Sequence, residues 1–308
     1  MTAVIETKSL SKWYGNVLGL SDVSLEIEAG ITGLLGPNGA GKSTFMKLIT
    51  GQMKPNIGGV TVRGEEVWNN FRLFRKIGFC PEQDAFYEDV TGWEFLTGLL
   101  RLYGFRPAEV TGRAARALEI VELTADKDRK IRSYSRGMRQ RVKFAQSVAH
   151  DPDIIILDEP LSGLDPLGKR RLIRLVKDFQ SEGKTIIVSS HVLPEIEAMT
   201  SRIIMIHQGK ILAQGDIHGI RDLIERYPHM ISVRCADARA VAARFVQDPS
   251  ILKMSFGPDA RSLVVETHNR DAFFSRLQSV VLETGIEVEE ISSPDDNLQA
   301  VFDYLVVR

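Results

Sequence analysis

Residues 36–44 of this 308-residue chain read Gly36-Pro37-Asn38-Gly39-Ala40-Gly41-Lys42-Ser43-Thr44. This order of residues matches the phosphate-binding pattern G-x-x-x-x-G-K-[ST] in full. A β-branched apolar run, Ile31–Leu35, precedes it, and a short helical pattern that stops before Gly51 follows it. Strand, glycine loop and helix is the order that turns successive backbone N–H groups toward phosphate oxygens, because glycine lets the backbone close around them. The stretch predicts a nucleoside triphosphate site in an α/β fold.

The residues of this loop have separate expected tasks. Lys42 is expected to reach the β- and γ-phosphates, and the Ser43 hydroxyl is expected to hold magnesium. The alternative is a glycine-rich turn with an incidental Lys-Ser pair, which the flanking strand and helix disfavour. The other residues of this loop that are expected to bind the nucleotide are Gly36, Asn38, Gly39, Gly41 and Thr44.

Composition narrows the functional classes. The chain has 39 Lys and Arg against 40 Asp and Glu, so it lacks the excess positive charge typical of nucleic-acid binding, and no nucleic-acid partner is expected. It has two cysteines, Cys80 and Cys235, too few for a disulfide framework, which favours a reducing compartment. The N-terminus does not resemble a secretory signal. No stretch approaches the roughly 20 apolar residues that span a bilayer, so any membrane spans would have to come from another chain.

The hydrophobic pattern predicts two domains. Residues 1–226 alternate short apolar runs with amphipathic segments, as in an α/β nucleotide-binding domain, and a helical pattern at about 86–150 interrupts them as an inserted subdomain. Residues 227–308 have the order β-α-β-β-α-β of a small α+β, ferredoxin-like domain. A last amphipathic helix is predicted at Asp295–Val306.

Local signals place individual elements. Thr91 and Glu94 have the spacing of a capping box, and Pro107 is suited to open a second helix. Strands of the first domain are predicted at Val60–Val62, Ile77–Phe79, Ile154–Leu157 and Thr185–Val188, with a hairpin of Arg202–Ile206 and Lys210–Ala213 across Gln208-Gly209. In the second domain, strands are predicted at Ile231–Cys235, Ile251–Ser255, Ser262–Glu266 and Ile286–Ile291, and helices at Arg239–Gln247 and Asp271–Glu283.

Two carboxylates follow the most apolar of these strands. Asp158 and Glu159 come directly after Ile154–Leu157. Asp158 is placed to hold a metal ion through water, and Glu159 to orient and polarise an attacking water. Taken alone, the pair is also compatible with an acidic helix cap after a core strand.

A further segment, Ser135-Arg136-Gly137-Met138-Arg139-Gln140-Arg141, lies shortly before the acidic strand. Ser135 is a good helix N-cap, and Gly137 lets backbone N–H groups approach an anion at the helix start. On spacing alone, an ordinary capped helix with a basic exposed side is equally compatible. The segment resembles the signature of ABC-transporter ATPases, and it occupies the place in the chain that this family gives it. The buried face of its helix is predicted at Met138, Val142, Ala145 and Ala149.

The resemblance covers about residues 4–225 and implies roles for more residues. Tyr14 resembles the aromatic residue that stacks on adenine, although a core aromatic is its structural alternative. Gln83 matches the glutamine that reaches the metal and the water at the join to the helical subdomain. His191, directly after a strand, matches the histidine near the γ-phosphate, and Ser162–Asp165 matches the loop that crosses the dimer interface. The resemblance thus implies catalysis by Glu159, His191 and Gln83, and a metal site of Ser43, Gln83 and Asp158.

Two features refine the resemblance. The family pattern has two glycines after the signature serine, whereas this chain has Arg136 and then Gly137. Near the C-terminus, the segment from Pro294 to Phe302 resembles the terminal helix of type-2 exporter ATPases, which pair with a separate permease chain. An amphipathic helix that closes the small domain is the alternative.

The family resemblance implies a head-to-tail dimer of two copies of this chain. ATP bound by Lys42, Ser43 and Gln83 of one copy would be completed by Ser135 and Gly137 of the other. Dimer closure on ATP binding would power transport, in the direction of export, through a separate multi-span permease. The subunit would lie peripherally at the cytoplasmic face of the membrane, coupled to the permease through the Gln83 loop and the segment that follows it. Phe86, Tyr87 and Trp93 of residues 84–100 would then either face the permease or pack inside the subdomain.

Other functions are compatible with parts of the pattern. A non-transport ABC ATPase that acts on nucleic acid or the ribosome would usually carry coiled coils, zinc modules or a second cassette, and the sequence shows none of these patterns. A cassette gated by a ligand of the C-terminal domain is a further alternative. A GTPase is disfavoured because an Asn-Lys-x-Asp segment is absent. The transported molecule would be selected by the permease and is not specified by this chain.

Overall fold

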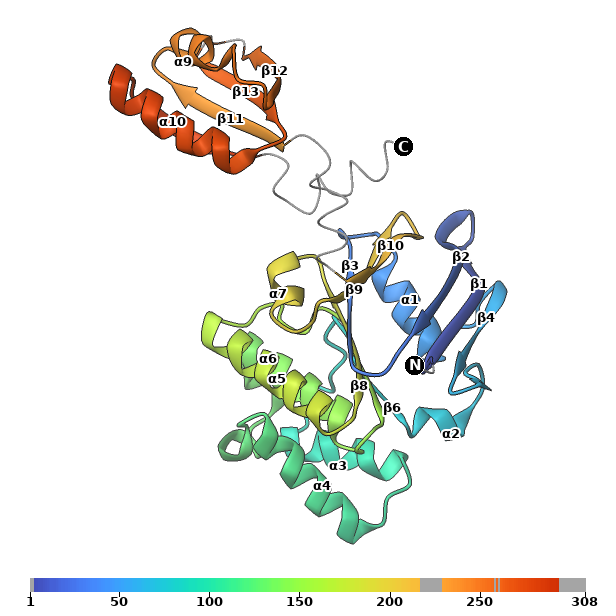
Figure 1. The fold of residues 1–308 in the computed structure, drawn as a ribbon. Helices are drawn as coiled ribbons and strands as arrows, with labels where there is room; N and C mark the ends of the chain where they lie inside the picture. The colour runs from blue at the N-terminus through green and yellow to red at the C-terminus, as the bar shows by residue number, and fades with distance from the viewer. Residues whose placement is uncertain (1–2, 217–228, 258, 260, 294–308) are drawn as a thin grey trace. The chain divides into compact units, whose positions relative to one another are not determined.

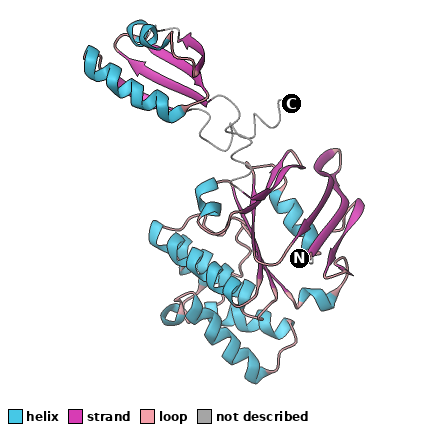
Figure 2. Cartoon of the chain, viewed as in Figure 1, coloured by secondary structure: helices cyan, strands magenta, loops and turns pink. Residues whose placement is uncertain are grey.

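A computed structural model describes residues 3–216, 229–257, 259 and 261–293. The chain divides into two compact units, residues 1–216 and 217–308 (Figures 1 and 2). The predicted domain boundary at 226/227 and the predicted helix Asp295–Val306 lie outside the described residues.

The first unit is built on a six-stranded sheet in the order β10-β9-β3-β8-β7-β6. All neighbouring strands are parallel except the β9–β10 hairpin. The central strands are continuous apolar runs because both of their faces are buried. The bounds are β3 Ile31–Leu35, β6 Ile77–Cys80, β7 Ile154–Leu157, β8 Thr185–Ser190, β9 Arg202–His207 and β10 Lys210–Asp216. The strands predicted for this sheet are confirmed.

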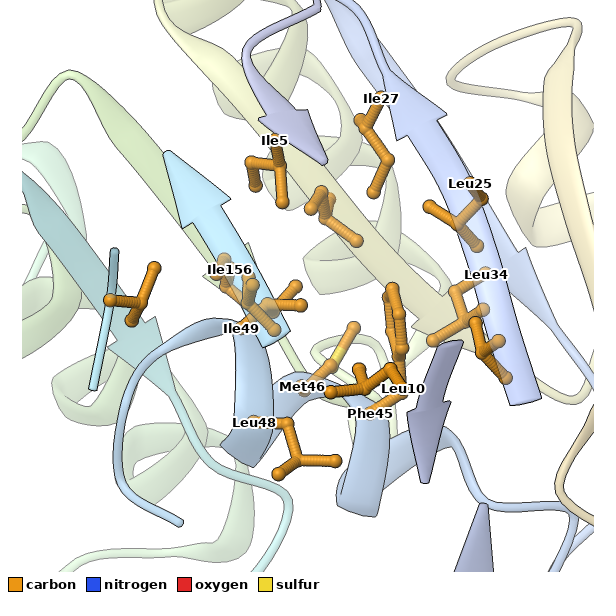
Figure 3. Packing of buried hydrophobic residues seen from close by; sticks show 14 of the residues in the cluster. Ile5, Leu10, Leu25, Ile27, Leu34, Phe45, Met46, Leu48, Ile49 and Ile156 are labelled. Carbon is orange, nitrogen blue, oxygen red and sulfur yellow. The ribbon is translucent and has the colours of Figure 1, made fainter. Parts of the chain in front are cut away.

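A second sheet of the first unit is antiparallel and has the order β2-β1-β4-β5. Its strands are β1 Ile5–Tyr14, β2 Val17–Ile27, β4 Ile57–Val62 and β5 Glu65–Glu66. Helix α1, Lys42–Ile49, joins both sheets in one hydrophobic core. Figure 3 shows Phe45 and Met46 of α1 among Leu10 of the second sheet and Leu34 and Ile156 of the first. This packing fixes the start of α1, and with it the glycine loop.

The segment between β6 and β7 is helical. Its helices are α3 Gly92–Leu102, α4 Pro107–Ile120 and α5 Arg136–Val148, with 3₁₀ turns at Thr124–Asp126 and Ile131–Ser133. The predicted capping box is present, since Glu94 N donates to Thr91 Oγ1 (3.1 Å) and Thr91 N to Glu94 Oε2 (2.8 Å). Ser135 caps α5 by accepting from Met138 N at 3.3 Å. The remaining helices of the unit are α2 Phe71–Phe74, α6 Pro166–Ser181 and α7 Leu193–Glu197.

The second unit has the element order β-α-β-β-α-β. Its elements are β11 His229–Cys235, α9 Ala238–Phe245, β12 Ile251–Phe256, β13 Ser262–Thr267, α10 Arg270–Thr284 and β14 Val288–Ser292. The strands form an antiparallel sheet in the order β12-β13-β11-β14. Alternate residues of β11 and β13 pack against both helices, where the Phe245 and Phe273 rings lie 4.8 Å apart. The elements predicted for residues 231–291 are therefore present, with ends shifted by up to two residues.

The topology gathers the predicted site at one edge. Strands β3, β8, β7 and β6 are consecutive neighbours and run parallel, so their carboxyl ends meet. The residues that follow these ends are the glycine loop after β3, His191 after β8, Asp158 and Glu159 after β7, and Gln83 shortly after β6. In open α/β sheets, ligands bind at this edge.

Candidate functional site

Glycines hold the phosphate loop against its surroundings. Gly41 has a φ of +108°, and a Cβ there would lie 2.9 Å from Gly19 O of β2. The β9–β10 turn supports the loop from another side, because Gly209 N donates to Ala40 O (2.8 Å) and Gly209 O accepts from Ser21 N (2.8 Å). A larger residue at Gly41 would separate these segments. Helix α1 starts directly after the loop and has no acidic residue in its first turn, which suits an anion at its N-terminus.

Lys42 is almost completely buried and has three oxygen partners. Its Nζ donates to Gly36 O (2.7 Å) and Pro37 O (3.3 Å), and lies 3.1 Å from Glu159 Oε1. The Lys42 and Glu159 side chains are each 6% exposed. A buried charge is strongly unfavourable unless it is paired. Each of these two residues therefore needs the other in order to stay charged in its buried position.

Glu159 also connects to His191. Its Oε2 lies 3.0 Å from His191 Nδ1, and because a carboxylate oxygen accepts, the Nδ1–H donates. Glu159 has a φ of +47°, an unusual backbone conformation for a residue with a side chain. The carboxylate therefore lies between a lysine from the phosphate loop and a histidine from the end of β8.

Ser189 joins the two carboxylate residues, and the sequence did not single it out. Its Oγ accepts from Glu159 N (2.8 Å) and donates to Asp158 Oδ1 (2.7 Å). All three residues are buried. The available signal was a pair of serines, Ser189 and Ser190, at the end of a buried strand, since a buried hydroxyl needs a partner.

Tyr14 and Gln83 lie at the margins of this cluster. Tyr14 is 45% exposed, and its hydroxyl lies 3.2 Å from both Thr44 Oγ1 and Met53 Sδ. The exposed ring is thus fastened at its polar end to the first turn of α1. Gln83 is exposed, three residues beyond the end of β6.

Ser135 and Gly137 belong to a different group of residues. They line a hollow of about 510 Å³ together with Gly163, Leu164 and Asp165, and no phosphate-loop residue is part of its lining. The remaining walls come from α4, α5 and α6. Within the described residues, the predicted site therefore has two parts. The phosphate-loop group contains Lys42, Asp158, Glu159 and His191, and the signature group contains Ser135 and Gly137.

Arg136 connects the signature to the loop before α6. Its Nη2 lies 3.3 Å from Ser162 Oγ, as a donor, and its side chain covers Gly163. A Cβ on Gly163 would lie 2.1 Å from Arg136 Nε, and Gly163 has a φ of +75°. Arg136, which replaces the first glycine of the family pattern, thus has room for its side chain because residue 163 is a glycine.

The donor set of the phosphate-loop group suits magnesium. The Ser43 hydroxyl and the buried Asp158 carboxylate offer hard oxygen ligands, and Mg²⁺ usually takes one or two protein oxygens together with phosphates and waters. Glu159 Oε1 is a buried oxygen without a hydrogen bond, beside Lys42. Over the described ranges, no cluster of three or more His, Cys, Asp or Glu side chains could hold a metal ion by itself.

The helices of the described part of the chain include none with the length and apolar character needed to cross a bilayer.

Comparison with known proteins agrees with this geometry. Residues 20–162 match the family model described as ABC transporter. The chain is 32% identical to the bacitracin transport ATP-binding protein BcrA of Enterococcus faecalis, over 99% of this chain and 97% of that protein. It is 38% identical, over 70% of this chain and 67% of the other, to an uncharacterized ABC transporter ATP-binding protein of Nostoc.

Solved structures give the same result for the fold. The dimeric structure of a bacterial ABC transporter cassette aligns with a TM-score of 0.65 at 28% identity, covering 69% of this chain and 98% of that one. Residues 20–162, which match the family model, include the phosphate loop, the acidic residues after β7 and the signature helix α5. The chain therefore belongs to the ATP-binding proteins of ABC transporters, the ATPase subunits that power transport.

Proposed function

We propose that this subunit powers export through a separate membrane permease, using ATP bound with magnesium at the edge formed by β3, β7 and β8. The observation that carries the proposal is the buried ion pair of Lys42 and Glu159 beside the phosphate loop, with the half-exposed His191 ring hydrogen-bonded to the Glu159 carboxylate. Phosphoryl transfer to water needs positive charge at the phosphates and a group that orients the attacking water. Lys42 would supply the charge, Glu159 would orient the water, and His191 would hold the Glu159 carboxylate.

The residues have distinct tasks in this mechanism. When ATP binds, Lys42 exchanges the carbonyl oxygens of Gly36 and Pro37 for phosphate oxygens. Glu159, relieved of Lys42, orients and polarises the attacking water, and His191 holds the carboxylate and faces the γ-phosphate. Ser43, Asp158 and Gln83 would hold magnesium, which would supply positive charge against the charge that develops on the phosphates. The adenine ring stacks on Tyr14.

We further propose that the working unit is a head-to-tail dimer. Ser135 and Gly137 line a hollow to which no phosphate-loop residue contributes, which supports their being supplied to a bound triphosphate by a second copy of the chain. The similarity to a dimeric cassette supports this arrangement. Closure of the two copies around ATP, and their reopening after hydrolysis, would drive the permease from the cytoplasmic face of the membrane.

Contact with the permease is assigned to the Gln83 loop and residues 84–100. Of the three aromatic residues considered there, Tyr87 is 78% exposed and available. Phe86 instead packs on Phe95, with ring centroids 5.3 Å apart, and the Trp93 ring lies under Lys127.

Two domain assignments belong to the same proposal. Residues 86–150 would form the inserted helical subdomain of a nucleotide-binding domain that spans 1–226, as the helices α3, α4 and α5 support. Residues 227–308 would form a ferredoxin-like accessory domain, supported by its element order and its antiparallel sheet.

Transport into inverted membrane vesicles that contain the chain and its permease tests the export proposal. Bacitracin is the first molecule to try, because a relative is named for its transport. ATP-dependent uptake that is lost in Lys42→Ala supports export, whereas uptake equal in both proteins contradicts it. Unchanged ATP hydrolysis in Lys42→Ala would contradict the site itself.

A further inference from the structure

One face of α5 holds two loops of the ATP site. Gln140 Nε2 donates to Pro160 O (2.7 Å), directly after Glu159. Lys143 Nζ donates to Glu82 O (2.6 Å) and pairs with Asp84 Oδ1 (3.0 Å). Residues three or four apart share a helix face, so α5, which begins at the signature, contacts the segment after β6 and the segment after β7 from a single side.

Lys143 is the unexpected member of this face. It is 3% exposed, although lysine is among the residues least often fully buried. A buried ammonium is tolerated where it is paired and hydrogen-bonded. Its two partners, Glu82 and Asp84, are the residues on either side of Gln83. Gln83 itself is exposed, so the loop is fixed through its neighbours and its amide is left available.

Arg139, one turn earlier on α5, strengthens the same attachment. Its Nη1 donates to Glu88 Oε1 (2.9 Å) and lies 3.8 Å from Asp84 Oδ2. Asp84 therefore faces two cations of one helix. A solvated loop would not need a buried lysine bonded to one of its carbonyl oxygens and one of its carboxylates, so the attachment serves the position of the loop.

We propose that Lys143 is a positioning residue for the hydrolysis reaction. It fixes residues 82–84 so that the Gln83 amide is directed at the metal and the attacking water, and it ties this loop to the helix whose N-terminus carries Ser135. The inference rests on the role proposed above for Gln83. It adds a connection within one subunit between the loop that senses its own nucleotide and the helix that would serve the nucleotide of the partner copy.

A double-mutant cycle with Gln83 tests the proposal in the full chain. Lys143→Met keeps the aliphatic stem and removes the charge, and Gln83→Ala removes the amide. If Lys143 acts through Gln83, Lys143→Met lowers kcat by about 10-fold or more, because misplaced groups lose orientation. It also raises the magnesium concentration needed for half-maximal activity and leaves the affinity for ATP without magnesium within about twofold. In the Gln83→Ala background, Lys143→Met then has almost no additional effect on kcat.

Further variants separate positioning from stability. Asp84→Asn, at an exposed residue, weakens one contact of Lys143 and should give a smaller change of the same kind. Lys143→Arg retains a cation and should recover part of the activity. Lys184→Met is the matched control, since Lys184 also pairs with an aspartate, Asp151 (2.5 Å), and the two residues precede β8 and β7, whereas the site residues lie at the carboxyl ends of these strands. It should leave kcat and the magnesium requirement unchanged.

Each outcome has a definite meaning. Additive losses in Lys143→Met and Gln83→Ala, or a loss in Lys143→Met with an unchanged magnesium requirement, would reduce Lys143 to a structural ion pair and overturn the inference. Full activity of Asp84→Asn and Lys143→Met would overturn it as well. If Gln83→Ala itself hydrolyses ATP normally, the proposed role of Gln83 fails first, and the two failures are thereby distinguished.

Discussion

Lys42 and Glu159, 117 positions apart in the chain, form a buried ion pair with 3.1 Å between Nζ and Oε1. The residue expected to bind phosphate is therefore paired with the residue expected to activate water. In the mechanism proposed above, ATP binding would also release Glu159 for catalysis, because the carboxylate and the phosphates would compete for the same ammonium group. The carboxylate would stay paired with Lys42 until a triphosphate competes for the lysine.

Glu159→Gln should separate binding from hydrolysis. The amide keeps the size of the side chain but neither activates water nor holds Lys42 by charge, so hydrolysis should fall by about 10²–10⁴-fold. ATP affinity should be unchanged or higher, since Lys42 is freed more easily. Phosphate release and equilibrium nucleotide binding measure the two effects, and ATP should shift the variant toward a dimer in size-exclusion chromatography. Turnover at the wild-type rate would remove Glu159 from the mechanism.

Ser189→Ala should reduce both stability and activity. Ser189 satisfies Glu159 N and Asp158 Oδ1 in a buried site, so its loss should cost about 1–3 kcal/mol in the free energy of unfolding. Because it also fixes the Glu159 backbone, kcat should fall with little change in KM. Ser181→Ala is the control: its hydroxyl donates to Asp178 O in an exposed position, and the expected change is within about 0.5 kcal/mol. Equal urea midpoints for the two variants would contradict the prediction.

Tyr14 should contribute to nucleotide affinity through its ring. Tyr14→Ala should weaken ATP binding by about 1–3 kcal/mol, the range for base stacking on an aromatic side chain. Tyr14→Phe keeps the ring and loses the hydroxyl contacts to Thr44 and Met53, so its affinity should remain near that of the wild type. Calorimetric titration with ATP distinguishes them. An equal loss in both variants would assign the effect to the hydroxyl instead of stacking.

Gly163→Ala should be destabilising for two reasons that a second variant separates. The positive φ costs a residue with a Cβ about 1–2 kcal/mol, and the new methyl group would meet the Arg136 side chain. Arg136→Gly restores the two-glycine pattern and removes only the second effect. Gly163→Ala should therefore cost less in the Arg136→Gly background, as measured by thermal unfolding. Identical costs in both backgrounds would show that Arg136 moves aside freely.

His150 should make the first unit sensitive to mild acid. Burial lowers the pKa of its imidazole from 6.5 to about 4, although its hydrogen bond with Ile77 O opposes the shift. The ring also stacks on Tyr103, with centroids 4.2 Å apart. Above pH 6.5 the ring is neutral in both folded and unfolded chains and contributes no pH dependence. Between pH 6.5 and about 4 the unfolded chain binds the proton more readily, so stability should fall as pH falls.

The size of this acid effect is bounded by the shift, at up to about 3 kcal/mol. His150→Phe keeps an aromatic ring on Tyr103 and should lose the acid-dependent part of the change, so its stability should decline less between pH 7 and 5. His268→Asn, at an exposed histidine, is the control. Parallel pH profiles for His150→Phe and the wild type would exclude His150 as the cause.

The sequence was sufficient to predict those helices and strands that leave one clear pattern of residues. The apolar runs of β3, β7 and β8 and the Thr91–Glu94 capping box were predicted because burial on both faces and a local cap each leave a distinctive pattern. Strands β1 and β2 were not recognised individually, since register shifts near Thr7, Leu10 and Lys12 break the alternation that marks a strand.

The site was predictable only in part for a related reason. Lys42, Glu159 and His191 occur in recognisable local patterns, so their types and spacings were informative. The partners of Ser189 and Lys143 lie tens of residues away, on segments that only the sheet order brings close. Lys143 in particular occupies a helix with a basic sequence, where burial of one cation depends on the path of the loop after β6.

The contact between the β9–β10 turn and the phosphate loop has a consequence for the synthesis of this protein. Gly209 supports Ala40 and Ser21 by backbone hydrogen bonds, so a loop encoded early in the chain is completed by a turn that the ribosome adds some 170 residues later. A nascent chain that ends before Arg202 contains the whole nucleotide-binding motif but lacks its support. The subunit should therefore acquire firm ATP binding only when the hairpin has emerged.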